Sequence, residues 1–135
     1  MPRSSLAAFT ALWRAYGEGR LERSLDLLDG ECELVLLDGE STFHGHDGVR
    51  QWLDEVRRDW KTLTVTYSEV HEANPTCIVG IGRVSGTSTD GARTLDAPLA
   101  CVGEFREGRL VRARAFPDAQ DALRYVRERR RGTVA

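Results

Sequence analysis

The sequence predicts a single α+β domain in which a curved antiparallel sheet wraps around helices. Hydrophobic residues recur at helical spacing in the first part of the chain and change to strand-like spacing after Trp60. A run of long antiparallel strands cannot stay flat against one helix. Glycine inside a strand is tolerated chiefly at bends, bulges and close approaches, which favours strong curvature here. Four glycines fall inside these strand-like segments: Gly80, Gly82, Gly86 and Gly103.

Two helices are expected before the first strand. The first carries apolar side chains on one side, at three- and four-residue steps: Leu6, Phe9, Leu12, Trp13 and Tyr16. Ser4 or Ser5 can cap its start. Gly17 and Gly19 end this pattern. A second short helix follows and ends at Asp29 and Gly30, with an apolar side formed by Leu21, Leu25 and Leu28.

The first strand is expected over residues 31–38, because alternate residues share one face: Cys32, Leu34 and Leu36. A turn or short extended link over residues 38–44 leads to a third helix over residues 47–60. Asp47 in its first turn suits the positive end of the helix dipole. Its apolar side is formed by Val49, Trp52, Leu53, Val56 and Trp60.

Four strands and a last helix complete the expected order. The strands are predicted over residues 63–72, 76–87, 95–107 and 109–116. Turn-forming residues separate them at Asn74-Pro75, Thr89-Asp90-Gly91 and Glu107-Gly108. Asp118 is expected to cap a helix over residues 119–129, whose inward side carries Ala122, Leu123 and Val126.

Composition is that of a folded domain, with 41% hydrophobic and 30% charged residues in 135. We expect one domain over residues 1–135, with an ordered core of about 5–127 and a basic tail over 128–135. The net charge of −2 gives no overall basic field, so a broad nucleic-acid surface is not indicated. The one basic run complements the end of the last helix: Arg124, Arg127, Arg129, Arg130 and Arg131.

The three cysteines indicate neither a disulfide framework nor a zinc site, because Cys32, Cys77 and Cys101 lack CxxC or Cys/His ligand spacing. Arg14 and Glu18 interrupt the apolar stretch near the start, so no export signal is expected. No stretch approaches the roughly 20 apolar residues of a membrane span. A cytoplasmic protein is predicted, with no cofactor, metal, nucleic acid or membrane partner.

Four stretches, in this order, resemble landmarks of SnoaL-like members of the nuclear transport factor 2-like superfamily. They are WRAYGEGRLERSLDLLDGECEL, FHGHDGVRQWLDEVRRDW, LDAPLACVGEF and GRLVRARAFPDAQDAL. The resemblance implies a conical fold with a pocket between the concave sheet face and the helices. It also implies a homodimer formed through the outer sheet face. Members of the family include isomerases, cyclases and epoxide hydrolases.

The positions that carry acids in those enzymes differ here. The aspartate that family cyclases and epoxide hydrolases place near the end of the last strand matches Ala115. The aspartate base and acidic oxyanion donor of ketosteroid isomerase-like members fall near Leu36 and Cys101. A small change of register would bring Asp38 to the first of these. The resemblance in fold therefore does not carry a mechanism with it.

Ten residues are predicted to line the pocket as ligand-binding residues, on aromatic helix faces and on strand faces turned inward. They are Trp13, Tyr16, Leu36, Trp52, Val56, Trp60, Leu99, Cys101, Ala113 and Ala115. With Ala113 and Ala115 inward, alternation places Arg112, Arg114 and Phe116 on the outer face. The two arginines are then expected to pair with carboxylates there.

Candidates for acid–base chemistry are Asp38 and His44 as a base, with Tyr16 to polarise an oxygen. Glu69 and Asp96 are further acids able to face the cavity, although a strand-end or surface position is favoured for each. His44 and His46 flank a glycine, which indicates a turn rather than a metal site.

Three functions stay open on the sequence. The first is a binding protein for a small, largely apolar organic molecule that is flat or cyclic. The second is a cofactor-independent isomerase, cyclase or hydrolase using the same pocket. The third is an interaction module that dimerises through the outer sheet face.

Overall fold

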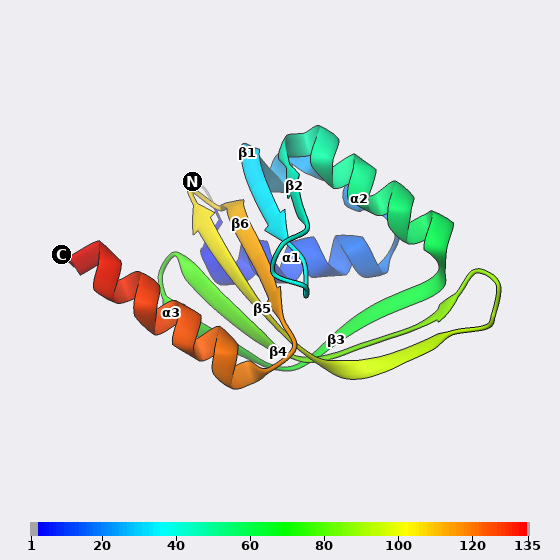
Figure 1. Ribbon diagram of the computed structural model, residues 1–135. Helices are drawn as coiled ribbons and strands as arrows, with labels where there is room; N and C mark the ends of the chain where they lie inside the picture. The colour runs from blue at the N-terminus through cyan, green and yellow to red at the C-terminus, as the bar shows by residue number, and fades with distance from the viewer. Residues whose placement is uncertain (1–2, 135) are drawn as a thin grey trace.

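The computed structural model describes residues 3–134, with side chains up to residue 129. Within that range the chain forms three α-helices, two short 3-10 turns and one six-stranded sheet (Figure 1). The helices are α1 (Ser5–Gly17), α2 (Gly45–Asp59) and α3 (Ala119–Val134). The 3-10 turns are η1 (Leu21–Arg23) and η2 (Leu25–Leu27). The strands are β1 (Leu28–Val35), β2 (Thr42–His44), β3 (Trp60–Asn74), β4 (Cys77–Ser88), β5 (Thr94–Arg106) and β6 (Arg109–Phe116).

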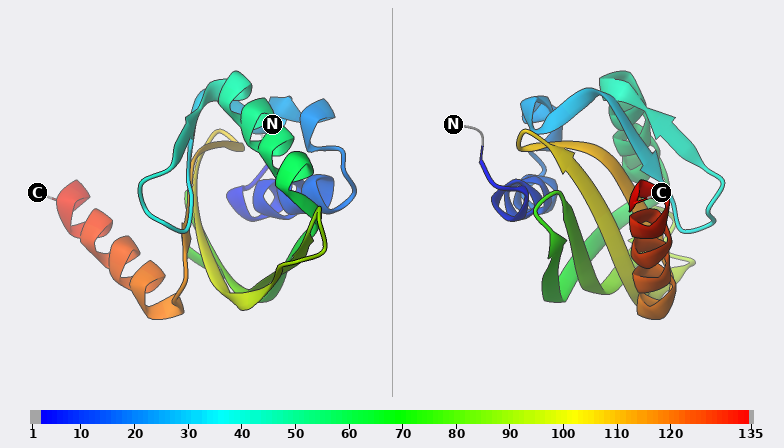
Figure 2. Two further views of the ribbon diagram at one scale, coloured as in Figure 1. Left: turned by 45° about the vertical axis from the view of Figure 1, so that its right-hand side comes forward. Right: turned by 90° about the vertical axis from the view of Figure 1, so that its left-hand side faces the viewer.

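The sheet is strongly curved and has the strand order β2-β1-β6-β5-β4-β3. It curls around α1 and α2, which lie on its concave side, while α3 stands against the outer side (Figure 2). This is the predicted α+β cone. The prediction of an antiparallel sheet fails at one pair, because β1 and β6 run parallel. The chain reaches β6 only after passing through α2 and four other strands, and sequence periodicity carries no information on such pairings.

The predicted second helix is wrong in type. Residues 21–27 form the two 3-10 turns instead, and β1 begins at Leu28, which pairs with Leu110 of β6. A helix of two turns is marginal by itself, so the strand pairing decides the conformation of this segment. The last helix is also longer than predicted, since it continues past Arg129 to Val134 through much of the expected tail.

Helix ends follow the expected chemistry. The Ser4 side chain caps α1 by accepting a hydrogen bond from the Ala7 amide at 3.1 Å. The Asp118 carboxylate accepts one from the Gln120 amide at 2.7 Å in the first turn of α3. Both α1 and α3 therefore begin at the residues that the sequence indicates.

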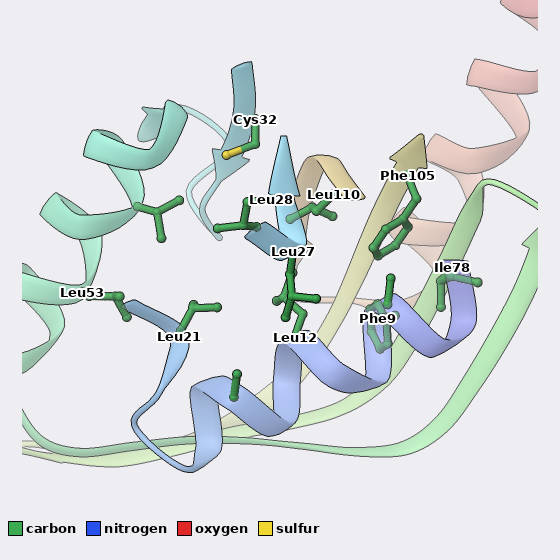
Figure 3. Packing of buried hydrophobic residues seen from close by; sticks show 13 residues of the cluster. Phe9, Leu12, Leu21, Leu27, Leu28, Cys32, Leu53, Ile78, Phe105 and Leu110 are labelled. Carbon is green, nitrogen blue, oxygen red and sulfur yellow. The ribbon is translucent and has the colours of Figure 1, made fainter. Parts of the chain in front are cut away.

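Buried side chains form two clusters on opposite faces of the sheet. On the concave side, Phe9 of α1 lies beneath Phe105 and Leu21 faces Leu53 of α2 (Figure 3). On the outer side, Val79, Ala100, Val102 and Phe116 pack under Ala122 and Val126 of α3. The helices on both sides thus hold the curved sheet between them.

Two strand glycines permit the curvature and the close approach of α1. A Cβ atom at Gly80 would lie 2.7 Å from the Tyr67 ring and 2.8 Å from the Phe9 ring. A Cβ atom at Gly82 would collide with the Thr66 carbonyl, next to the register shift between Tyr67 and Glu69. No helix of the described residues is long and apolar enough to cross a membrane.

Candidate ligand-binding cavity

Two adjoining chambers lie between the concave sheet face and helices α1 and α2. The inner chamber has a volume of about 90 Å³ and the outer chamber about 400 Å³. Both touch the same five side chains, so these stand at the junction: Trp13, Leu36, Trp52, Cys101 and Ala115. The outer chamber alone has room for a small organic molecule, and the inner chamber adjoins it.

The inner chamber is apolar. Leucine, valine, alanine and aromatic side chains from α1, α2 and three strands make most of its wall, and no charged residue lines it. Strand pairing brings the small residues of this wall together, because Cys101 pairs with Ala115 and Gly103 with Ala113. Short side chains at these paired positions leave the chamber empty.

The outer chamber is walled by aromatic rings from the two helices. Tyr16 of α1 stacks on Trp52 of α2, with ring centroids 5.5 Å apart and planes inclined by 20°. Trp13 meets the Tyr16 ring edge-on at 5.6 Å, and Trp60 also lines the chamber. Burial raises the pKa of the Tyr16 hydroxyl, which donates a hydrogen bond to the Leu63 carbonyl at 2.9 Å. Tyr16 is therefore neutral at physiological pH, and its proton is already engaged.

The thiol of Cys101 lines both chambers. Burial raises the pKa of Cys101 to about 12, and hydrogen bonding to Tyr67 opposes this only in part. A thiol with this pKa is neutral and a poor nucleophile at physiological pH. The Tyr67 ring lies over Gly80, and burial raises the pKa of its hydroxyl. This buried hydroxyl has the thiol, a weak acceptor, beside it and no other partner among the described residues.

Sequence reasoning missed Tyr67. The signal was available, because Leu63, Val65 and Tyr67 alternate along β3 and the first two line the outer chamber. Tyr67 pairs with Gly82 of β4, and Gly80 lies two residues away on the same strand. A glycine at that position leaves room for the Tyr67 ring to lie across the sheet.

All ten residues predicted to bind a ligand line one or both chambers. Of the three acid–base candidates, Asp38 and Tyr16 both line the outer chamber, whereas His44 lines neither. Asp38 stands at the rim of the outer chamber, where it accepts hydrogen bonds from the Ser41 hydroxyl and from the Glu40 and Ser41 amides. These bonds hold the pKa of the Asp38 carboxyl below its usual range. His44 does not line either chamber; its exposed ring lies 3.4 Å from Glu33.

The further acids also face away from the cavity. Glu69 lies 3.3 Å from His71, and Asp96 pairs with Arg83 at 3.0 Å. Neither lines a chamber, and both side chains are paired at the surface. The side chain of a strand residue follows its place in the alternation, and the register shift after Tyr67 moves Glu69 out of the inward set.

The outer face carries the arginines, as predicted. Arg112 lies 3.3 Å from the Glu33 carboxylate and 5.9 Å from the centroid of the Tyr125 ring. Arg114 stacks on Phe116 at 5.0 Å and on Tyr125 at 5.3 Å. Tyr125 of α3 thus covers both guanidinium groups.

Within residues 3–134, no group of three or more histidine, cysteine or acidic side chains is placed to hold a metal ion. His46 Nε2 instead lies 2.9 Å from the Leu28 carbonyl oxygen.

Comparison with known proteins identifies the fold family. The model of the SnoaL-like domain family matches residues 9–113. An NTF2-like protein of unknown function from Burkholderia pseudomallei is similar in structure, with a TM-score of 0.75, 22% identity, and 89% of this chain and 95% of that chain covered. No curated protein matches the chain significantly.

Two further structural neighbours were crystallised with ligands. TerC, co-crystallised with polyporic acid, has a TM-score of 0.74 and 20% identity, with 89% of this chain and 95% of that chain covered. A Mycobacterium tuberculosis protein in complex with estradiol-17β-hemisuccinate has a TM-score of 0.73 and 19% identity, with 87% and 97% covered. At these identities the likeness is one of fold.

Proposed function

The chain belongs to the SnoaL-like domain family, and we propose that it uses the cavity of this fold to bind a small, largely apolar organic molecule with a flat or cyclic body. The make-up of the cavity carries the proposal: an inner chamber without charges adjoins an outer chamber walled by stacked aromatic rings. Ring compounds suit such walls, because stacking adds to the gain from burying apolar surface. The organic ligands held by two proteins of the same fold lend support.

Binding is favoured over acid–base catalysis by the placement of the titratable groups. Catalysis would need a base within hydrogen-bond reach of a bound substrate. His44 faces Glu33 outside the cavity, and the Asp38 carboxylate is engaged in its own turn. The Tyr16 hydroxyl already donates to a backbone carbonyl. These existing hydrogen bonds of Asp38 and Tyr16, and the position of His44 outside the cavity, count against the isomerase, cyclase or hydrolase alternative.

Titration with N-phenyl-1-naphthylamine, a neutral apolar fluorophore, tests the proposal. All three tryptophans line the outer chamber, so a probe bound there quenches their emission by energy transfer. We expect saturable binding with one site per chain. Ala115→Leu, at the junction of the chambers, should weaken it strongly. Leu123→Ser, which removes an exposed apolar side chain on α3, should leave it unchanged. Non-saturable binding, or equal binding by the Ala115→Leu variant, would contradict the proposal.

Homodimerisation through the outer sheet face remains part of the proposal. Helix α3 packs on the outer side of β4, β5 and β6, so a partner would have to use the part of that face that α3 leaves uncovered (Figure 2). Arg112 and Arg114 lie under Tyr125 and are not expected to lead the contact. Light scattering after size exclusion should give twice the chain mass; a monomer at high concentration would refute the dimer.

A further inference from the structure

The charges that line the cavity are all negative. Asp38, Glu55 and Asp59 border the outer chamber, and no lysine, arginine or histidine lines either chamber. The inner chamber carries no charge at all. A ligand that fills both spaces therefore meets an apolar environment at one end and carboxylates at the other.

Among these three carboxylates, Glu55 differs in its lack of a bonding partner. Asp59 bonds to the Arg58 guanidinium at 3.1 Å, and Asp38 is held in its turn by Ser41. Glu55 is half-buried, and it has no hydrogen bond and no ion pair within the described residues. The positive charge of Arg58 attracts Glu55, but the Arg58 guanidinium makes its hydrogen bonds with Asp59.

Helix α2 turns this carboxylate toward the aromatic wall. Residues 52, 55, 56 and 59 all line the outer chamber, at the spacing of one helix face. Glu55 thus stands about one turn from Trp52, whose ring stacks on Tyr16. Aromatic faces attract cations, and a nearby carboxylate adds to that attraction. Arg93 sits over Trp60 at 5.9 Å from the ring centroid, but it does not line the chamber.

We propose that the ligand is an apolar ring compound bearing a protonated amine, with its ring between Trp13, Trp52 and Cys101 and its ammonium group at Glu55. The inference rests on the proposed function and adds the charge of the ligand. A carboxylate or sulfonate ligand would lose its hydration at the mouth and gain only like-charged neighbours. An ammonium group keeps partial hydration at the rim and gains the unpaired carboxylate. The cavity accordingly selects against anions.

Calorimetric titration with three ligands of one ring system tests the charge: naphthalene-1-methylamine, naphthalene-1-methanol and naphthalene-1-carboxylate. We expect the amine to bind about fivefold more tightly than the alcohol, the gain of one partly exposed ion pair. The carboxylate should bind more weakly than both. Glu55→Gln should remove the advantage of the amine and leave the alcohol unchanged.

Asp54→Asn is the matched control, because Asp54 lies on the same helix, outside the cavity, where it pairs with Arg57 at 2.9 Å. It should change none of the three affinities. Equal affinities for all three compounds, or tightest binding of the carboxylate, would overturn the charge inference while leaving a ligand-binding cavity in place. Failure of all three to bind would overturn the proposed function as well.

Discussion

Replacement of Ala115 by leucine should stabilise the protein if the cavity is empty. Ala115 faces both chambers, so the three added carbon atoms have unfilled space to enter. Burial of about 0.8 kcal/mol per methylene contributes about 2.4 kcal/mol. Ordering the leucine side chain costs about 0.5 to 1 kcal/mol. The expected net gain in the free energy of unfolding is about 1.5 kcal/mol.

Ala100→Leu is the matched comparison, because it makes the same change one residue from Cys101 on the opposite face of the sheet. Ala100 is completely buried and packs with Val79, Val102 and Ala122 beneath α3. No space is available there, and overpacking of this kind costs about 1 to 3 kcal/mol.

Urea unfolding followed by far-ultraviolet circular dichroism measures both changes. The two variants should move the unfolding midpoint in opposite directions. Equal destabilisation of both would refute the reasoning, because it would mean that side chains already fill the space around Ala115.

Three further predictions follow from individual side chains. Tyr16→Phe should lower the free energy of unfolding in urea by about 1 kcal/mol, because it loses the hydrogen bond to the Leu63 carbonyl. Tyr67→Phe should lower it less or raise it, because the Tyr67 hydroxyl lacks a strong acceptor. The reverse order would contradict this account. Cys101 should resist iodoacetamide at pH 8 in the native protein and react in urea, as mass spectrometry of its peptide would show; rapid native alkylation would count against a buried thiol of raised pKa. The free energy of unfolding should fall below about pH 4, because hydrogen bonds lower the pKa of Asp38 and Asp90 in the folded state. The stability that these carboxylates contribute is present above their unfolded-state pKa and is lost as pH falls through the folded-state pKa. Asp90→Asn should therefore make the free energy of unfolding less dependent on pH in acid.

Local periodicity was sufficient to find much of the cavity wall. Trp52, Val56 and Trp60 recur at helical steps, and Leu99 and Cys101 alternate along a strand, so the inward faces followed from spacing alone. The family resemblance then indicated that the inward faces enclose a pocket. The sequence could not show how the rings contact one another, because the stacking of Tyr16 on Trp52 depends on how two helices pack.

Features that depend on long-range pairing were missed. The Tyr67 hydroxyl reaches Cys101 only because Gly80, on the strand between them, has no side chain. The parallel pairing of β1 with β6 converts a helix-like pattern at Leu28 into a strand. The turn that engages Asp38 depends on Ser41, which hydrophobic patterning does not register.

A crystal structure of the ligand-free protein under xenon pressure tests the central claim most directly, because xenon enters apolar cavities that water leaves empty. We expect a xenon atom bounded by Trp13, Trp52, Cys101 and Ala115, at the junction of the two chambers. Side chains packed through that position, with no xenon bound, would contradict it.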